Sequence, residues 1–135
     1  AAKPTRASRL QLLRRVAELG PFAYTAGHFR IMIVYVDVDD TLVRSAGTTR
    51  IPIMSVIEHV RQLKADGATL YLWSAGGADY CRNTAIELGI EDCFVAFLPK
   101  PRIMIDDQEV KDWVFCTTFH PATCNGKRLE DYLRP

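Results

Sequence analysis

The sequence lacks any long apolar run. No stretch of this 135-residue chain reaches the roughly 18 consecutive apolar residues that a membrane-spanning helix needs. Its first residues, AAKPTRASRL, contain no apolar core of the kind that a signal peptide has. Internal repeats and low-complexity segments are also absent. We therefore expect a cytoplasmic protein with one folded domain and no contact with a membrane.

Cysteine is scarce as well. The chain has 4 cysteines, while 48% of its residues are hydrophobic and 24% are charged. These values are ordinary for a globular protein that can build its own apolar core. The cysteines therefore fit reduced thiols better than a disulfide framework.

The small net charge of +1 hides an asymmetry between the two parts of the chain. Residues 1–30 carry six Lys or Arg against one Glu, and residues 31–135 carry eleven against fifteen acidic residues. The basic part has apolar residues at three- and four-residue spacing, followed by Gly20-Pro21, which predicts a helical extension and a linker. These apolar residues are Leu10, Leu13, Val16 and Ala17. A basic amphipathic helix can contact nucleic acid, a membrane surface or a partner, but we expect its apolar stripe to pack on the core or on a second copy in a homodimer.

The most informative stretch is Ile31 to Leu42, IMIVYVDVDDTL. A short apolar run rich in Ile and Val is typical of a strand that is buried in a parallel sheet. Side chains alternate along a strand, so Asp37 and Asp39 can lie on one side of it, where the strand ends. Two close carboxylates repel each other unless a cation or a shared proton relieves them. A strand followed by an acidic, helix-capping loop is the alternative for this pattern alone.

The remainder of the chain predicts alternating helices and strands. A polar loop is expected over 43–50. Helices are expected from near Pro52 to just before Gly67, over 78–88 and, as a short element, over 126–133. Strands are expected over 68–73, 93–98, 102–105 and 113–116. Such alternation implies right-handed crossovers between parallel strands. We therefore predict an α/β fold, a Rossmann-like three-layer α/β/α sandwich with a mostly parallel five-stranded sheet.

Polar residues follow the later strands in a regular order. Ser74 ends the strand-like ATLYLW, Lys100 follows FVAFLP, and Asp106-Asp107 follow RIMI. Together with DVDDTL at residues 37–42, this series resembles the four motifs of the haloacid dehalogenase (HAD) superfamily of phosphohydrolases. The resemblance covers residues 31–135, and the joint pattern is far more specific than any single motif.

The resemblance implies a role for each catalytic residue. Asp37 is the expected nucleophile, which forms an aspartyl-phosphate, and Asp39 is the acid that protonates the leaving group and then activates water. Ser74 is expected to hydrogen-bond the phosphoryl group, and Lys100 to offset its charge. The carboxylate at Asp39 looks like that of the phosphatases or phosphomutases of the superfamily, because its dehalogenases lack an acid there and its transport ATPases carry Thr.

The resemblance also implies Mg²⁺ as cofactor. The expected ligands are Asp37, the main-chain carbonyl of Asp39, and the pair Asp106 and Asp107, since Mg²⁺ prefers oxygen ligands. Many relatives space the last two acids several residues apart, whereas here they are adjacent. Which of them contacts the metal stays open, and we favour Asp106.

Each of these residues has a plainer interpretation when it is taken singly. Ser74 can cap the next helix, Lys100 can be a solvated loop residue, and Asp106-Asp107 can form a turn. A further set, Cys116, His120 and Cys124, has ligand types that suit zinc. Its spacing is unusual and no fourth ligand is evident, so a packed, reduced C-terminal segment is the preferred interpretation.

Family members usually carry a cap domain in one of two intervals. Here the interval after Asp39 has room only for a loop and one helix, and Leu98 is separated from Lys100 by a single proline. We therefore expect a site without a cap domain. The resemblance implies that the protein acts as a phosphatase on a phosphorylated small molecule. A non-catalytic binding module of the same fold is the main alternative, and a nucleic-acid end phosphatase is a further one.

Overall fold

The computed structural model describes residues 31–132 of the chain. Its contacts separate residues 1–30 from residues 31–135, and the helix predicted in the first of these units lies outside the described residues. Within residues 31–132 no helix is long and apolar enough to cross a membrane.

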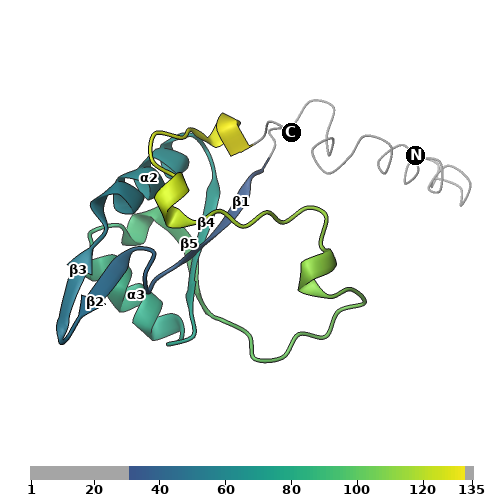
Figure 1. The fold of residues 1–135 in the computed structure, drawn as a ribbon, viewed down its shortest axis with the longest axis horizontal. Coiled ribbons are helices and arrows are strands. Elements are labelled where there is room, and N and C mark those ends of the chain that lie inside the picture. Colours follow the sequence, from purple (N-terminus) through teal and green to yellow (C-terminus); the bar gives the residue numbers. More distant parts are fainter. Residues whose placement is uncertain (1–30, 133–135) are drawn as a thin grey trace, which may run out of the picture. The chain divides into compact units, whose positions relative to one another are not determined.

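A parallel sheet forms the centre of the described unit (Figure 1). Its strands are β1 (Ile33–Asp37), β4 (Thr69–Ser74) and β5 (Phe94–Pro99), in the order β1-β4-β5. The register pairs Asp37 with Trp73 and Ser74 with Pro99, so the three strands end at nearly the same level. Residues that follow these strands therefore gather at one edge of the sheet.

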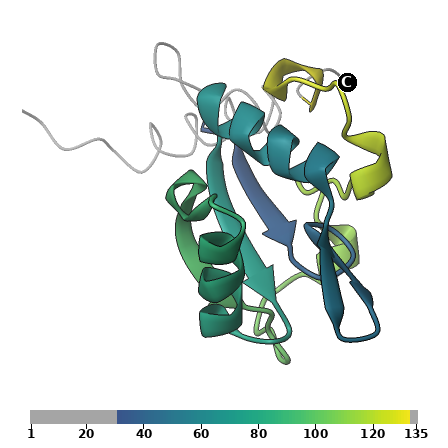
Figure 2. The ribbon, with the colours of Figure 1, turned by 90° about the vertical axis from the view of Figure 1, so that its left-hand side faces the viewer.

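Both long helices cover the same face of this sheet. Helix α2 (Met54–Ala65) connects β1 to β4, and α3 (Ala78–Glu87) connects β4 to β5. Figure 2 shows both helices in front of the strands. Two successive right-handed crossovers that advance in the same direction place their helices on one side. The described residues thus form two layers, and the predicted three-layer sandwich is wrong for them.

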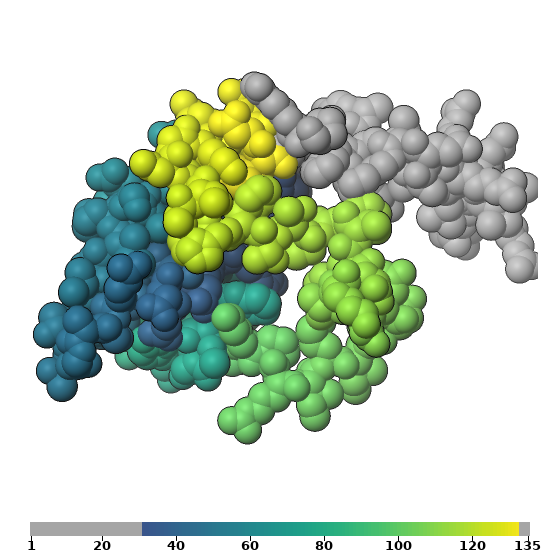
Figure 3. Space-filling view, viewed as in Figure 1, coloured from purple at the N-terminus to yellow at the C-terminus, as the bar shows by residue number. Residues whose placement is uncertain are grey.

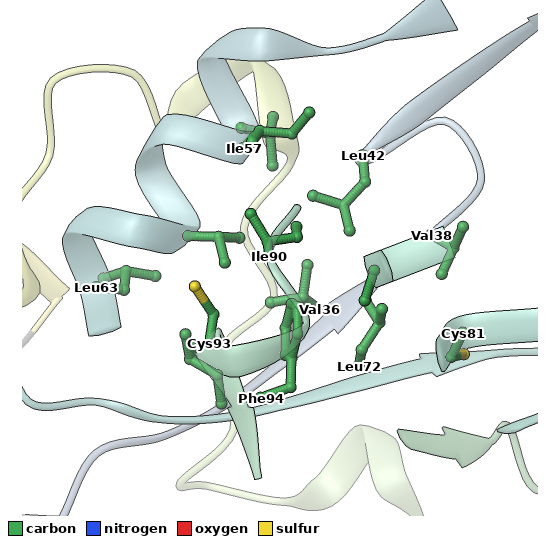
Figure 4. Packing of buried hydrophobic residues seen from close by; sticks show 14 of the residues in the cluster. Val36, Val38, Leu42, Ile57, Leu63, Leu72, Cys81, Ile90, Cys93 and Phe94 are labelled. Atoms are coloured by element: carbon green, nitrogen blue, oxygen red, sulfur yellow. The ribbon is translucent and has the colours of Figure 1, made fainter. Parts of the chain in front are cut away.

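The core lies between the sheet and these helices. In β4, Leu70, Leu72 and Ser74 are buried, while the residues between them are partly exposed, as alternation along a strand requires. Figure 4 shows Leu72 and Val36 of the sheet lying opposite Ile57 and Leu63 of α2. Removing a buried side chain such as Leu72, which is 0% exposed, typically costs about 2–5 kcal/mol of stability.

The other face of the sheet carries aromatic side chains. The ring of Tyr35 lies 5.1 Å from that of Tyr71 and 5.0 Å from that of Trp73. Tyr35 remains 47% exposed. Within residues 31–132 no second layer of helices covers this face.

A β-hairpin replaces the polar loop that was predicted over residues 43–50. Strands β2 (Val43–Ala46) and β3 (Thr49–Pro52) pair antiparallel, with Gly47 at the turn in a positive-φ conformation (+62°). Pro52 ends β3 and does not begin the helix. Most side chains of the hairpin are exposed, so no apolar alternation revealed these strands in the sequence.

The predicted strands over 102–105 and 113–116 do not form, so the sheet has three strands and not five. Residues 101–120, here called the arch, follow β5 and contain one short helix, η2 (Val110–Asp112). The arch extends away from the sheet (Figures 1 and 3). Ile103 and Ile105 of the arch are 82% and 101% exposed. Runs of three apolar residues (103–105) and four (113–116) satisfy the pattern of a strand, but a strand also needs a paired edge, which both runs lack here.

The C-terminal segment returns to α2. It contains the short 3-10 helices η3 (Pro121–Thr123) and η4 (Leu129–Tyr132), the second of which lies within the helix predicted over 126–133. A further short helix, η1 (Glu91–Cys93), leads into β5. The side chain of Arg128 anchors the segment through a salt bridge to Asp66, the residue that follows α2.

Candidate functional site

Asp37 is the last residue of β1, at the carboxyl edge of the sheet. Its Oδ1 lies 2.9 Å from the Nζ atom of Lys100, and its Oδ2 accepts a long hydrogen bond of 3.4 Å from the hydroxyl of Thr41. The side chains of Asp37 and Lys100 are 31% and 38% exposed. A carboxylate that solvent can reach thus has a cation on one oxygen and only a weak partner on the other.

The turn after β1 holds the acidic residues in place. The carbonyl oxygen of Val38 accepts hydrogen bonds from three backbone N–H groups, those of Thr41, Leu42 and Val43. Val38 and Leu42 are fully buried, and Asp40 between them adopts a left-handed conformation with φ of 59°. Aspartate tolerates this conformation better than most residues do. The buried side chains on both sides therefore fix where the exposed Asp39 projects.

Asp39 has a partner that the sequence analysis missed. The hydroxyl of Tyr80, in the first turn of α3, donates a hydrogen bond of 2.6 Å to Asp39 Oδ1. This hydrogen bond is the main cause that raises the pKa of Tyr80, and burial is the second cause. Arg50 of β3 donates in turn to the Tyr80 oxygen at 3.3 Å. No local motif signals either residue, because they come together from a helix and a hairpin that are far apart in the sequence.

Ser74 and Lys100 lie side by side at the ends of β4 and β5. Ser74 is 1% exposed, its Oγ accepts a hydrogen bond of 3.0 Å from the N–H of Gly76, and its carbonyl accepts one of 2.9 Å from the N–H of Lys100. Helix α3 has Gly77 as its N-cap, so the interpretation of Ser74 as a helix cap is wrong. Lys100 lies in the loop after β5 with its side chain 38% exposed, as the plainer interpretation expects, and it also forms an ion pair with Asp37.

Asp106 and Asp107 are not brought to this site. Both lie on the arch, where Asp106 Oδ1 accepts a hydrogen bond of 2.9 Å from the N–H of Gln108. This bond and the neighbouring Asp107 hold the pKa of Asp106 below its usual range. The local geometry is that of a turn. Within residues 31–132 the structure assembles no group of three or more His, Cys, Asp or Glu side chains that could hold a metal ion.

The cysteine closest to the site is not a nucleophile. Cys81 is 0% exposed, and its Sγ donates to the carbonyl of Leu98 at 3.7 Å. Burial, reinforced by the charges of Asp37 and Asp39, raises the pKa of this thiol. Only the thiolate form attacks efficiently, so Cys81 packs beneath the carboxylates without competing with them.

Of the residues Cys116, His120 and Cys124, the last two make contacts within the C-terminal segment. His120 Nδ1 accepts a hydrogen bond of 3.2 Å from the N–H of Ala122, which caps η3, and Cys124 Sγ donates to the His120 carbonyl at 3.5 Å. Cys116 is exposed on the arch.

Comparisons with known proteins found no relative of this chain. No family model, curated protein or solved structure matches the chain. Its chemistry follows from the residues themselves: a carboxylate paired with lysine, a second carboxylate held by a phenol, and a buried serine, all at the carboxyl ends of parallel strands.

Proposed function

We propose that the protein is a phosphohydrolase that acts on a phosphate monoester through an aspartyl-phosphate at Asp37. The observation that supports this proposal best is the 2.9 Å contact between Asp37 Oδ1 and Lys100 Nζ at the end of β1. Phosphoryl transfer depends on an in-line nucleophile and on positive charge beside the transferred group. Lysine next to the attacking carboxylate supplies that charge.

The reaction has two steps. Asp37 Oδ2, which has only the long bond to Thr41, attacks the phosphorus while the ester bond breaks and Asp39 gives its proton to the leaving oxygen. Asp39 then takes a proton from water, and that water attacks the phosphorus of the aspartyl-phosphate. Inorganic phosphate leaves, Asp37 regains its carboxylate, and Asp39 is protonated again.

Mg²⁺ is proposed as cofactor on the motif pattern, and the arrangement of acidic side chains does not complete a site for it. Asp37 and Asp39 are engaged with Lys100 and Tyr80, and Asp106 and Asp107 lie on the arch. Magnesium is usually held by one or two carboxylates together with waters and a substrate phosphate, and the two carboxylates gathered here are already paired with Lys100 and Tyr80. Neither step above is therefore assigned to a metal.

The substrate is proposed to be a small phosphate ester bound without a cap domain. Between β1 and α2 the chain has only a turn and the hairpin, and between β5 and Lys100 it has no further residue. Neither interval holds a domain that would enclose a substrate. We expect low selectivity among small phosphate esters for this reason.

Release of nitrophenol from 4-nitrophenyl phosphate, with Mg²⁺ and with a chelator, tests the proposal. A phosphatase turns this substrate over and slows when the metal is removed. If the ester binds but no nitrophenol is released under any divalent-metal condition, the protein is a binding module of this fold.

A further inference from the structure

We infer that Tyr80 positions Asp39, so that a single oxygen of that carboxyl group carries the proton that passes to the leaving group. The inference rests on the proposed function and adds a residue to it. Tyr80 is a positioning residue, because it acts through Asp39 and not on the substrate.

The direction of the hydrogen bonds follows from which groups can donate. Arg50 can only donate, so its bond of 3.3 Å to the Tyr80 oxygen must use a lone pair of that oxygen. The phenolic proton is then free to point at Asp39 Oδ1, 2.6 Å away, and an ionised carboxylate can only accept it. The chain of donors therefore runs from Arg50 through Tyr80 to Asp39.

Tyr80 is held firmly enough to act in this way. The guanidinium of Arg50 lies 5.3 Å from the centre of the Tyr80 ring, and it is itself fixed by Glu87 at 2.6 Å and Thr84 at 2.8 Å. Behind the ring, a Cβ placed on Gly76 would lie 2.8 Å from Tyr80 Cδ1. The ring is thus confined between the hairpin and the turn that begins α3.

This arrangement distinguishes the two oxygens of Asp39. The Tyr80 hydroxyl occupies Oδ1 of the ionised carboxylate, so Oδ2 is the oxygen that is free to take up and hold the proton. From there it moves to the leaving oxygen, and the proton taken from water returns to the same atom. Without Tyr80 the carboxyl group can rotate, and its proton is no longer held in one place.

The dependence on the leaving group tests this role. In Tyr80→Phe, kcat/KM for n-butyl phosphate should fall by about 10- to 100-fold, the range expected when a hydrogen bond to a charged group is lost. For 4-nitrophenyl phosphate it should fall less than about 3-fold, because nitrophenolate leaves without being protonated and general acid catalysis contributes little. Tyr71→Phe removes a hydroxyl from the aromatic face of the sheet and is the matched control, with both rates unchanged.

A double variant shows whether Tyr80 acts through Asp39. Asp39→Asn should give the same selective loss on n-butyl phosphate, and adding Tyr80→Phe to it should change little further, because residues that act as a unit are not additive. A fall of equal size for both substrates in Tyr80→Phe, or a full additional loss in the double variant, overturns the inference while the phosphatase activity stands. If the unaltered protein hydrolyses neither ester, the proposed function and this inference fail together.

Discussion

Asp37 and Lys100 meet across a strand that lies between them. Asp37 ends β1 and Lys100 follows β5, while β4 runs between these two strands, and the Lys100 ammonium lies 5.7 Å from the centre of the Trp73 ring of β4. An ion pair as exposed as this one contributes about 1 kcal/mol or less to stability. Its importance under the proposed function is instead that it places a cation beside the attacking carboxylate.

Replacing Asp37 by Asn should abolish turnover without unfolding the protein. The change removes the nucleophile, and kcat for 4-nitrophenyl phosphate should fall by about 10⁴-fold or more. Asp40→Asn is the matched control, since it makes the same substitution three residues later, at an exposed position whose left-handed backbone asparagine tolerates. Comparable turnover in Asp37→Asn, with an unchanged unfolding temperature, would remove the covalent mechanism.

Gly76 is needed for the space that it leaves to Tyr80. Its backbone is not in a positive-φ conformation, but an added Cβ would lie 2.8 Å from Tyr80 Cδ1 and 3.4 Å from Ser74 Oγ. Gly76→Ala should lower the free energy of unfolding by about 1–3 kcal/mol, as overpacking does. Thermal unfolding measures this loss. In a Tyr80→Ala background, where the ring is gone, the same substitution should cost much less, and equal costs in both backgrounds would contradict the steric explanation.

Among the elements, α2 both covers the sheet and anchors the C-terminal segment. Arg128 donates to Asp66, which follows the last turn of α2, and this bond together with the N–H of Leu129 holds the pKa of Asp66 well below its usual range. On the helix itself, His59 Nε2 lies 2.6 Å from the hydroxyl of Tyr132. The contacts join the last described residues to the middle of the chain.

The burial of His59 should make stability depend on pH. Burial, and secondly the charge of Lys127, lower the pKa of His59 below 6.5, while Asp66 acts in the opposite direction. The unfolded chain therefore takes up this proton first as the pH falls. The stabilisation is fully present above about pH 6.5 and is lost as the pH falls through the lowered value.

Unfolding temperatures between pH 7.5 and 5.5 test this expectation, since most carboxyl groups titrate below that window. The unaltered protein should lose stability toward pH 5.5, and His59→Gln should flatten that part of the curve. His120→Gln is the control, because this residue is exposed and its ring caps η3, and it should keep the slope. Parallel curves for the unaltered protein and His59→Gln would assign the pH dependence to other groups.

For the described unit as a whole, the arch is the part that does not join the core. It carries exposed apolar side chains, among them Ile105 at 101% and Val114 at 80% exposure. It also carries Asp106 and Asp107, which the motif pattern assigns to the metal. Asp37 and Asp39 thus lie on a different part of the unit from Asp106 and Asp107, the other two expected metal ligands.

Magnesium titration separates the two interpretations of the acidic pair. If Asp106 and Asp107 are metal ligands, replacing both with Asn should weaken Mg²⁺ binding by about 10-fold or more, as loss of carboxylate ligands does. Calorimetry measures this affinity in the absence of substrate. The control is Glu109→Gln with Asp112→Asn, which removes the same number of charges from the arch. Equal affinity in the two double variants would leave Asp106 and Asp107 as a turn.

Some elements of the fold could be predicted from the sequence and others could not. Strands β1, β4 and β5 and helices α2 and α3 were predicted to within a few residues, because each is long enough to show its own apolar period. The position of Asp37 at the end of β1 followed from the same period. Hairpin β2–β3 was missed because its pairing leaves most side chains exposed, so its pattern carries no sign of a buried face.

The sequence by itself thus determined which residues stand at the ends of the central strands, and a local signal was enough for that. Only the tertiary structure decided that both helices share one face, that Arg102 to Ile105 pairs with no strand, and that Tyr80 contacts Asp39. Each of these depends on contacts between segments far apart in the chain. A hydrogen bond across 41 residues is set by how α3 packs on the sheet, and no spacing along the sequence records it.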